Sequence, residues 1–223
     1  MVNYREFSAS IEKQFRNLFS DLEKSGLAAR EDSRAFGAMI EKRVIDSWEA
    51  ISRNIGAEFL EPPGRRTIYD VACTLGGTFI GFDIKTKDLD TTRYSDGGVC
   101  AVGNLLKFLA NDKGVFTVVE FGHDKAVEGR DLRDLEYIKV APFHLLPEDT
   151  YRTENLGTGP VRLNYSIRQI YDEIQWDRPL NGFFDIFTEI AIKHYERVGR
   201  DALKHVEAIR RFRQNGYVRF SFS

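Results

Sequence analysis

Two aspartates and a lysine, Asp70, Asp83 and Lys85, lie in a stretch whose pattern is typical of a β-hairpin. Runs rich in β-branched and aromatic residues flank the glycines at positions 76–77, and such a pair favours a two-residue turn because glycine accepts positive φ. If the turn consists of these two residues alone, Asp70 lies directly opposite Asp83, with both side chains on one face. Facing carboxylates repel each other in a plain sheet, but together they can bind a hard divalent cation.

The strand after the turn adds basic side chains to the two acids. Because side chains alternate along a strand, Asp83, Lys85 and Lys87 share one face, and the residues between them point to the other. An ammonium group at Lys85 can hold an attacking water or a phosphate oxygen, and a metal ion beside it lowers the pKa of its bound water. The alternative is a surface hairpin with incidental charges, but both acids lie within apolar runs, where an unpaired charge is costly. We therefore expect hydrolysis of a phosphodiester.

The order Asp70, twelve residues, Asp83, one residue, Lys85 resembles the active site of the PD-(D/E)XK nucleases, and its spacing is most similar to type II restriction endonucleases of the EcoRV-like group. The resemblance implies that Asp70, Asp83 and the backbone carbonyl of Ile84 bind Mg²⁺, and that Lys85 orients or activates the attacking water. It also implies products with a 5′-phosphate and a 3′-hydroxyl. At the level of motif and element order, it covers roughly residues 61–143.

The resemblance also implies partners. These are double-stranded DNA with a specific, palindromic site and a second copy of the chain, because a two-fold symmetric pair can cut both strands of such a site. The terminal helices, particularly residues 4–24, offer apolar surface for this homodimer. A DNA methyltransferase acting on the same site would be a further partner, which the sequence leaves open. Three alternatives also stay open: a repair or structure-specific nuclease of the same superfamily, a non-catalytic nucleic-acid or protein-binding module, and an α/β protein without a nucleic-acid role.

Two charged residues near the motif are candidates for auxiliary roles. In the nucleases that this chain resembles, a helix before the catalytic hairpin often brings a further acid toward the metal, and Glu41 is the candidate in this sequence. An equally simple interpretation is that Glu41 is one of several solvated acids on its helix. Lys87 shares the face of Lys85, and the sequence does not decide whether it takes part in the chemistry.

Three polar segments are candidates for DNA contact, although a solvated surface would explain each of them as well. Residues 61–66 form a Pro- and Gly-containing loop before Asp70, and residues 88–98 form a polar stretch after the hairpin. Residues 161–166 alternate as a short strand, whose Arg and Asn can pair with guanine and adenine edges. The expected DNA-binding residues are Arg65, Arg66, Thr91, Thr92, Arg93, Tyr94, Ser95, Arg162 and Asn164.

The surrounding elements must hold this hairpin in place. Apolar residues at helical spacing predict helices over residues 4–24, 32–55, 99–111, 167–175 and 182–214, the last one bent at Gly199. Buried-type strands are predicted at 115–121 and 137–143, and the first of them should run parallel to the strand of Lys85, because a helix connects the two. We therefore expect an α/β (α+β) fold, a mixed sheet of about five strands flanked by helices and similar to that of the restriction endonucleases.

The composition is compatible with one domain over residues 1–223, with a catalytic core at about 61–143 and helical flanks at 4–54 and 167–215. The net charge of −2 argues against a generally basic protein that coats DNA, but it allows a local basic groove. Two cysteines and four histidines have no zinc spacing and make no disulfide framework, so a reducing cytoplasm is expected. No apolar run is long enough to span a bilayer, and no secretory signal is present.

Overall fold

A computed structural model of the chain describes residues 2–20, 33–63, 67–89, 98–112, 114–123, 135–154 and 159–215. Its α-helices are α1 (Tyr4–Phe19), α3 (Ser33–Asn54), α4 (Val102–Lys107), α5 (Ile167–Ile170) and α6 (Leu180–Asn215). Its strands are β1 (Glu58–Leu60), β2 (Val71–Leu75), β3 (Thr78–Asp88), β4 (Gly98–Ala101), β5 (Val115–His123), β6 (Leu135–Pro142), β7 (Tyr151–Thr153) and β8 (Pro160–Leu163). A π-helical turn (Phe108–Asp112) and 3₁₀ turns at Phe143–Leu145, Glu148–Thr150 and Tyr171–Glu173 complete the described elements.

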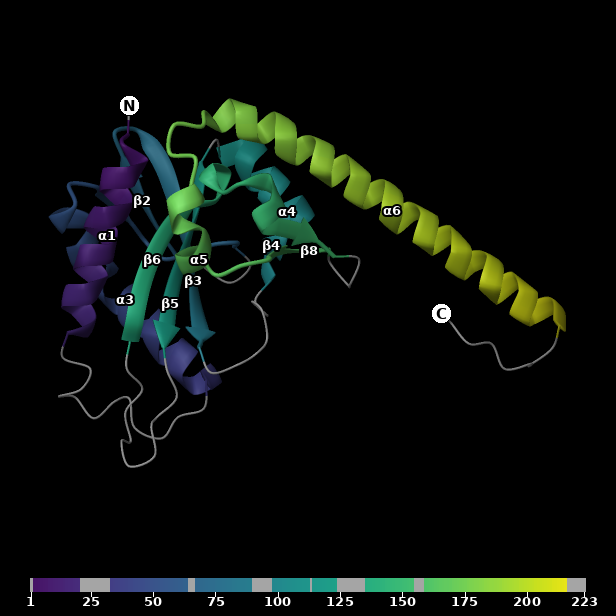
Figure 1. The fold of residues 1–223 in the computed structure, drawn as a ribbon, viewed down its shortest axis with the longest axis horizontal. Helices are drawn as coiled ribbons and strands as arrows, with labels where there is room; N and C mark the ends of the chain where they lie inside the picture. The colour runs from purple at the N-terminus through teal and green to yellow at the C-terminus, as the bar shows by residue number, and fades with distance from the viewer. Residues whose placement is uncertain are drawn as a thin grey trace.

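The centre of the molecule is a mixed five-stranded sheet with the order β1-β2-β3-β5-β6 (Figure 1). β3 and β5 are parallel, whereas the other neighbouring pairs are antiparallel. The predicted α/β (α+β) class with a mixed sheet of about five strands is therefore confirmed, as is the parallel pairing of β3, the strand of Lys85, with β5. The parallel pair is the middle of the sheet and connects the hairpin to the rest of the core.

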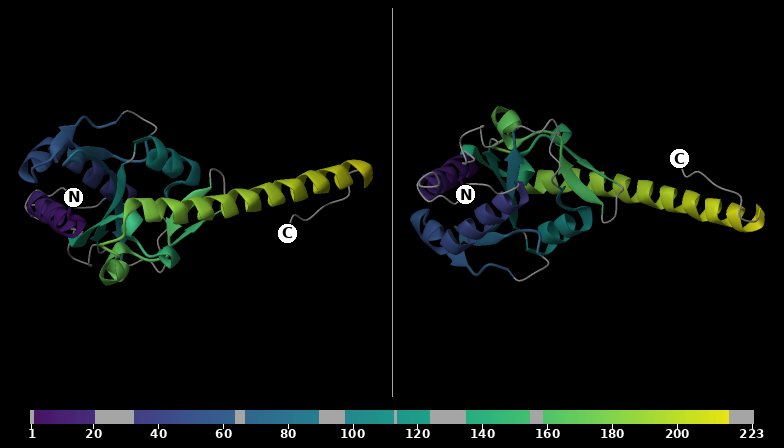
Figure 2. Two further views of the ribbon diagram at one scale, coloured as in Figure 1. Left: turned by 90° about the horizontal axis from the view of Figure 1, so that it is seen from above. Right: turned by 90° about the horizontal axis from the view of Figure 1, so that it is seen from below.

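Helices cover both faces of this sheet (Figure 2). α1 and α3 bury one face, where Trp48 of α3 lies edge-on to Phe82 and its indole N–H donates to the carbonyl of Ala72 at 2.6 Å. α4 and the first half of α6 cover the other face, packing against Phe116 and Val118 of β5. The side chains of Asp83 and Lys85 belong to the second face, because Asp83 pairs with Val118 in the parallel register.

A second sheet, with the order β4-β8-β7, lies beside the helices of this second face. The sequence predicted a helix from residue 99, and this boundary is wrong, because Gly98–Ala101 is a strand and α4 begins only at Val102. The reason is tertiary: β4 pairs antiparallel with β8, which lies some sixty residues later and supplies backbone partners that no local pattern reveals. The predicted helix at 167–175 is also shorter, because α5 ends at Ile170 and continues as a 3₁₀ turn.

α6 is a continuous helix of 36 residues that passes through Gly199 without a break, so the predicted bend does not interrupt it. Its first half packs against the body of the protein and its second half extends beyond it (Figures 1 and 2). No helix in the described ranges is both long and apolar enough to cross a bilayer.

α1 is part of the core and does not present an apolar surface to a partner. Its apolar side chains Phe7, Ile11, Phe15 and Phe19 are all buried against the sheet and α3. The expectation that residues 4–24 provide the dimer surface is therefore wrong for α1. Residues 21–24 lie outside the described ranges.

Glu12 of α1 ties this helix to the edge of the sheet, and its loss is expected to destabilise the fold. Its buried carboxylate accepts hydrogen bonds from the Val140 N–H of β6 at 3.0 Å and from the Tyr171 hydroxyl at 2.8 Å. Glu12→Ala leaves both donors without this acceptor, which should lower the free energy of unfolding by about 1–3 kcal/mol. Urea denaturation measures this effect; Glu12→Gln should recover part of the loss, and exposed Lys13→Ala should cost little. Equal losses in Glu12→Ala and Lys13→Ala would contradict this role.

Candidate active site

The predicted hairpin is present with the predicted register. β2 and β3 pair antiparallel from Leu75 opposite Thr78 to Val71 opposite Phe82. The turn glycines have φ values of 57° and 78°, which only glycine adopts without strain. β3 then continues to Asp88 beside β5, whereas its ladder with β2 ends at Phe82. From Asp83 onward, the edge of β3 on the side of β2 therefore has no ladder with β2.

Asp70 lies one residue before β2, at this end of the ladder. Its N–H donates to the carbonyl of Phe82 at 2.8 Å, and its Oδ2 accepts a hydrogen bond from the N–H of Ile84 at 2.7 Å. Asp70 is thus tied to the backbone of β3 at Phe82 and Ile84, and it is not set squarely opposite Asp83 as the hairpin geometry predicted. The Asp70 carboxylate nevertheless lies beside Ile84, between Asp83 and Lys85 along β3, so the two acids and the lysine still come together.

The backbone of Ile84 faces this carboxylate. In a β-strand the N–H and C=O of one residue point toward the same neighbouring strand. Since the N–H of Ile84 is directed to Asp70, its carbonyl also points along the edge that β2 leaves. This orientation is the one required of Ile84 if its carbonyl is to act as a metal ligand.

Asp83 and Lys85 form an ion pair on one face of β3, as the alternation of side chains predicts. The distance from Lys85 Nζ to Asp83 Oδ1 is 2.8 Å. Asp83 is buried, with 5% of its surface exposed, whereas 31% of the Lys85 side chain remains accessible. The second oxygen of Asp83, Oδ2, is buried and has no hydrogen-bond partner among the described residues. A buried carboxylate oxygen without a donor is costly unless a cation or another donor approaches it.

Burial raises the pKa of the Asp83 carboxyl to about 7, although the Lys85 ammonium opposes this shift. The charges of Asp70 and Glu41 raise it further. For Lys85, burial lowers the pKa, but the neighbouring Asp83 carboxylate outweighs it, so the net shift is upward. Lys85 is therefore a cation at neutral pH, while Asp83 is poised to gain or lose a proton there.

Glu41, from α3, joins this group of charges. Its pKa is raised by partial burial and then by the charge of Asp70, while Lys85 acts in the opposite direction. The structure thus brings the predicted auxiliary acid into the electrostatic neighbourhood of the hairpin from an element that precedes it by about thirty residues. Glu41 itself remains an exposed side chain on α3.

The residues at this place fit a hard divalent cation. The charge of Asp70 raises the pKa of both Asp83 and Glu41, one buried oxygen of Asp83 has no hydrogen-bond partner among the described residues, and the carbonyl of Ile84 points to the same edge. Within the described ranges no three His, Cys, Asp or Glu side chains gather closely enough to bind an ion by themselves. Mg²⁺ does not require such a cage, because it keeps several waters and takes only one or two carboxylates. Asp70 and Asp83 with the Ile84 carbonyl are the set that would hold it.

Sequence reasoning missed Cys100, which lies at this site. Burial and the nearby Asp83 carboxylate raise the pKa of its thiol, while Lys85 opposes them, so the side chain is close to both groups. It was missed because β4, the strand that carries it, was predicted as the start of a helix. Its position makes it part of the protein wall beside the acid and lysine pair.

Glu120 of β5 was also missed, and it lies at the paired position next to Lys85. Its buried carboxylate accepts a hydrogen bond from the Tyr137 hydroxyl at 2.8 Å and others from the N–H groups at the start of α5. Burial raises its pKa, and the charge of Lys87 is among the effects that lower it. The charge of Lys87 thus acts on Glu120, whereas Lys85 is paired with Asp83. A charged residue inside the apolar run of β5 was the signal that could have marked Glu120.

The expected DNA contacts are only partly within the described structure. Arg65, Arg66, Thr91, Thr92, Arg93, Tyr94 and Ser95 lie outside the described residues. Arg162 and Asn164, at β8, belong to a polar cluster: Arg162 Nε lies 2.7 Å from Glu154 Oε2, and Arg152 donates to the Asn164 side-chain oxygen at 2.7 Å. Both side chains therefore already have protein partners, and their role in base recognition stays a prediction.

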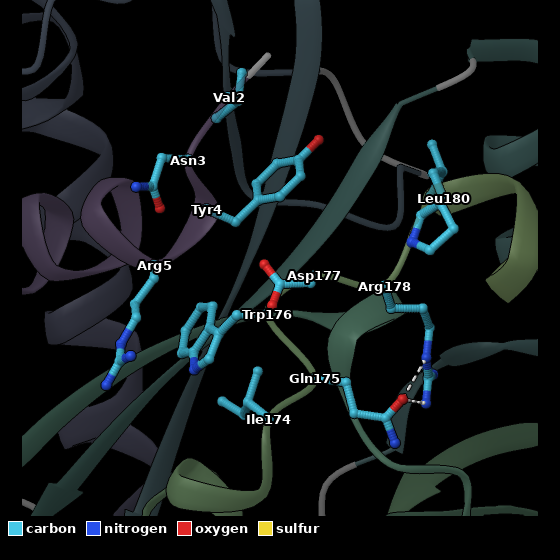
Figure 3. A pocket seen from close by; sticks show the side chains of 11 residues that line it. Val2, Asn3, Tyr4, Arg5, Ile174, Gln175, Trp176, Asp177, Arg178 and Leu180 are labelled. Carbon is cyan, nitrogen blue, oxygen red and sulfur yellow. Dashed lines mark hydrogen bonds between the residues drawn. The ribbon is translucent and has the colours of Figure 1, made fainter.

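A separate hollow of about 1240 Å³ lies between the N-terminal segment and residues 174–180 (Figure 3). None of the predicted site residues lines it. Arg178 at its wall donates to Gln175 Oε1 and to the carbonyls of His144 and Leu146, at 3.2 and 3.0 Å for the last two. This arginine closes the loop before α6, so its hydrogen bonds have a structural role.

No protein-family model and no curated protein matches this chain, so the assignment of its activity rests on the geometry of Asp70, Asp83 and Lys85.

Proposed function

We propose that this protein is a Mg²⁺-dependent endodeoxyribonuclease of the type II restriction class, which hydrolyses phosphodiesters at a specific, palindromic site in double-stranded DNA. The observation that carries the proposal is the ion pair between Lys85 and the buried Asp83, beside the Asp70 carboxylate where β3 extends past β2. The second oxygen of Asp83 has no hydrogen-bond partner among the described residues. A structural ion pair alone explains neither the unpartnered oxygen of Asp83 nor the charges of Asp70 and Glu41 that act on it and raise its pKa.

Each residue has a defined task in the proposed reaction. Asp70, Asp83 and the Ile84 carbonyl would hold Mg²⁺, which when bound supplies charge neutralisation at the phosphate and a bound water of lowered pKa. Lys85 is protonated at neutral pH because Asp83 raises its pKa, so it acts as a hydrogen-bond donor and not as a general base. It orients the attacking water or stabilises the charge that develops on the phosphate oxygens. In-line attack by water leaves a 5′-phosphate and a 3′-hydroxyl.

The test is incubation of the purified protein with unmethylated phage DNA, once with Mg²⁺ and once with EDTA. The wild-type protein is expected to give discrete bands only with Mg²⁺, and Asp83→Ala to give none, because the proposed metal site loses its most buried ligand. The matched control is Asp46→Ala, which removes an exposed acid of α3 that pairs with Lys42 and is not among the proposed site residues. This variant should cut like the wild type.

The other outcomes of this assay are equally clear. A smear that requires Mg²⁺ and Asp83 would replace site-specific cleavage by a repair-type nuclease activity. Cleavage that survives Asp83→Ala would refute the assignment of the site. No cleavage of linear or branched DNA by the wild-type protein would reject the nuclease and leave a binding module of the same fold.

A further inference from the structure

From Ile192 onward, α6 carries large apolar side chains that the other described residues leave exposed. The helix packs on the body through Phe183, Phe187 and Ala191, and Arg197 still donates to the carbonyl of Thr153 at 2.8 Å. Beyond this point the helix extends away from the body (Figures 1 and 2) and its described side chains are mostly exposed. The exposed large apolar residues of α6 are Ile192 (47%), Tyr195 (50%), Leu203 (65%), Val206 (41%) and Ile209 (59%).

This surface has the spacing of a helix–helix seam. Four of these five residues, Ile192, Tyr195, Val206 and Ile209, lie on one line of the helix with Gly199 and Ala202 between them, in alternating steps of three and four residues as at the a and d positions of a two-stranded coiled coil. Leu203 lies beside this line. We refer to this line as the α6 seam, which consists of Ile192, Tyr195, Gly199, Ala202, Val206 and Ile209. A solvated helix has no need of such a regular apolar line.

Gly199 at the middle of the seam indicates a close approach by another backbone. Glycine is the poorest helix former except proline, so its presence inside a helix requires a reason. The chain's own packing does not supply one, because a Cβ at Gly199 would meet nothing within 4 Å. Together with Ala202 one turn later, it makes a shallow place at which a second helix can cross closely.

We infer that the α6 seam pairs with the same seam of a second copy of this chain, in antiparallel orientation. The order of side-chain sizes along the seam reads alike from both ends, with large residues outside and small ones in the middle. An antiparallel pair then matches Ile192 with Ile209 of the second copy, and Tyr195 with Val206. The small residues Gly199 and Ala202 meet each other at the crossing point.

The charges beside the seam favour this orientation. In the antiparallel pair Glu189 of one copy lies next to Arg210 of the other on the flank of the seam, and such flanking ion pairs set partner orientation in coiled coils. A parallel pair would place His205 next to Arg210, both basic, and would bring the two globular bodies to the same end of the helices. A second copy of this chain fits the seam because the order of side-chain sizes along the seam matches its own reverse, as a two-fold symmetric interface requires.

The first test is the mass of the full chain in solution, measured by light scattering and by sedimentation over a range of concentrations. The wild-type protein is expected to be a dimer. The double variant Val206→Gln/Ile209→Gln should weaken the dimer by at least about tenfold, because it removes apolar area from the seam. The matched variant Lys204→Gln/Arg211→Gln introduces two glutamines on the face of α6 opposite the seam and should leave the dimer unchanged. All four side chains are exposed in the monomer, so folding is not at risk.

A third variant, Gly199→Gln, tests the close crossing. Glutamine is the better helix former, so the isolated helix gains stability, whereas the dimer should weaken because the side chain fills the crossing point. Orientation is tested by oxidation of variants that each carry one added cysteine: a mixture of Ile192→Cys and Ile209→Cys should cross-link through the added cysteines, and Ile209→Cys alone should not. A monomeric wild type, or a dimer that neither the seam variant nor Gly199→Gln weakens, would overturn the inference. Cross-linking of Ile209→Cys to itself would overturn the orientation. None of these readouts depends on DNA cleavage.

Discussion

Lys85→Ala is expected to abolish DNA cleavage while leaving DNA binding nearly intact. The Lys85 ammonium lies 2.8 Å from Asp83 Oδ1 and remains protonated at neutral pH, so its proposed contribution is to water orientation and to charge in the transition state. Positioned groups of this kind contribute about 10²–10⁴-fold to a rate, and we expect a loss of about 10³-fold. Cleavage rates and gel-shift affinities in Ca²⁺ measure the two effects separately.

Lys87→Ala is the matched control for this prediction. Lys87 lies on the same strand and the same face, but its charge acts on Glu120. Its removal should slow cleavage by less than about tenfold, since it is not paired with the metal-binding acid. Because Lys85 also opposes the effect of burial on the pKa of Asp83, its removal should raise that pKa above about 7, so both variants should be compared over a range of pH values up to the alkaline. Equal losses in the two variants would mean that the catalytic lysine is misassigned.

His144 is expected to make a contribution to the pH dependence that lowers stability as the pH falls from about 7 to about 4, opposite in sign to the contribution of the buried Asp83. Its side chain is 2% exposed, and neither ring nitrogen has a hydrogen-bond partner among the described residues. Burial, and then the charge of Arg178, lowers its pKa from 6.5 to about 4. The unfolded chain therefore binds a proton between these pH values that the folded chain does not, so stability is lost as pH falls. The difference corresponds to about 3 kcal/mol.

His144→Leu tests this prediction. The leucine has similar bulk and no group to protonate, so the variant should lose less stability between pH 7 and pH 4 and should be at least as stable as the wild type at neutral pH. His205→Gln, on the exposed half of α6, is the control and should keep the wild-type pH dependence. Urea denaturation at several pH values provides the free energies of unfolding. Parallel curves for wild type and His144→Leu would contradict the prediction.

The core of the candidate site was predictable because its determinants are local. The two turn glycines with positive φ specify the hairpin register, and the alternation of a strand specifies that Asp83 and Lys85 share a face. The parallel strand β5 also followed from the sequence, since a helical connection between two strands requires it. These inferences use only neighbours along the chain, and the structure agrees with them.

Only the tertiary structure decided which distant residues complete the site. Glu41 is near Asp70 because α3 packs on the sheet, and Cys100 is near Asp83 because β4 pairs with β8. The offset of Asp70 from its predicted partner also depends on the point at which β2 stops pairing. Long-range contacts of this kind leave no periodic signal in the sequence, because they depend on which apolar faces find each other.

The amphipathic pattern of the helices shows the same division. The sequence by itself predicted amphipathic helices over residues 4–24 and 182–214, because apolar periodicity is a local property, and the structure has helices at Tyr4–Phe19 and Leu180–Asn215. The sequence did not determine what covers each apolar face. α1 buries its apolar face in the core, whereas the seam of α6 continues beyond the body of the protein. The difference arises because α1 lies on the sheet along its whole length, whereas α6 is longer than the surface on which it packs.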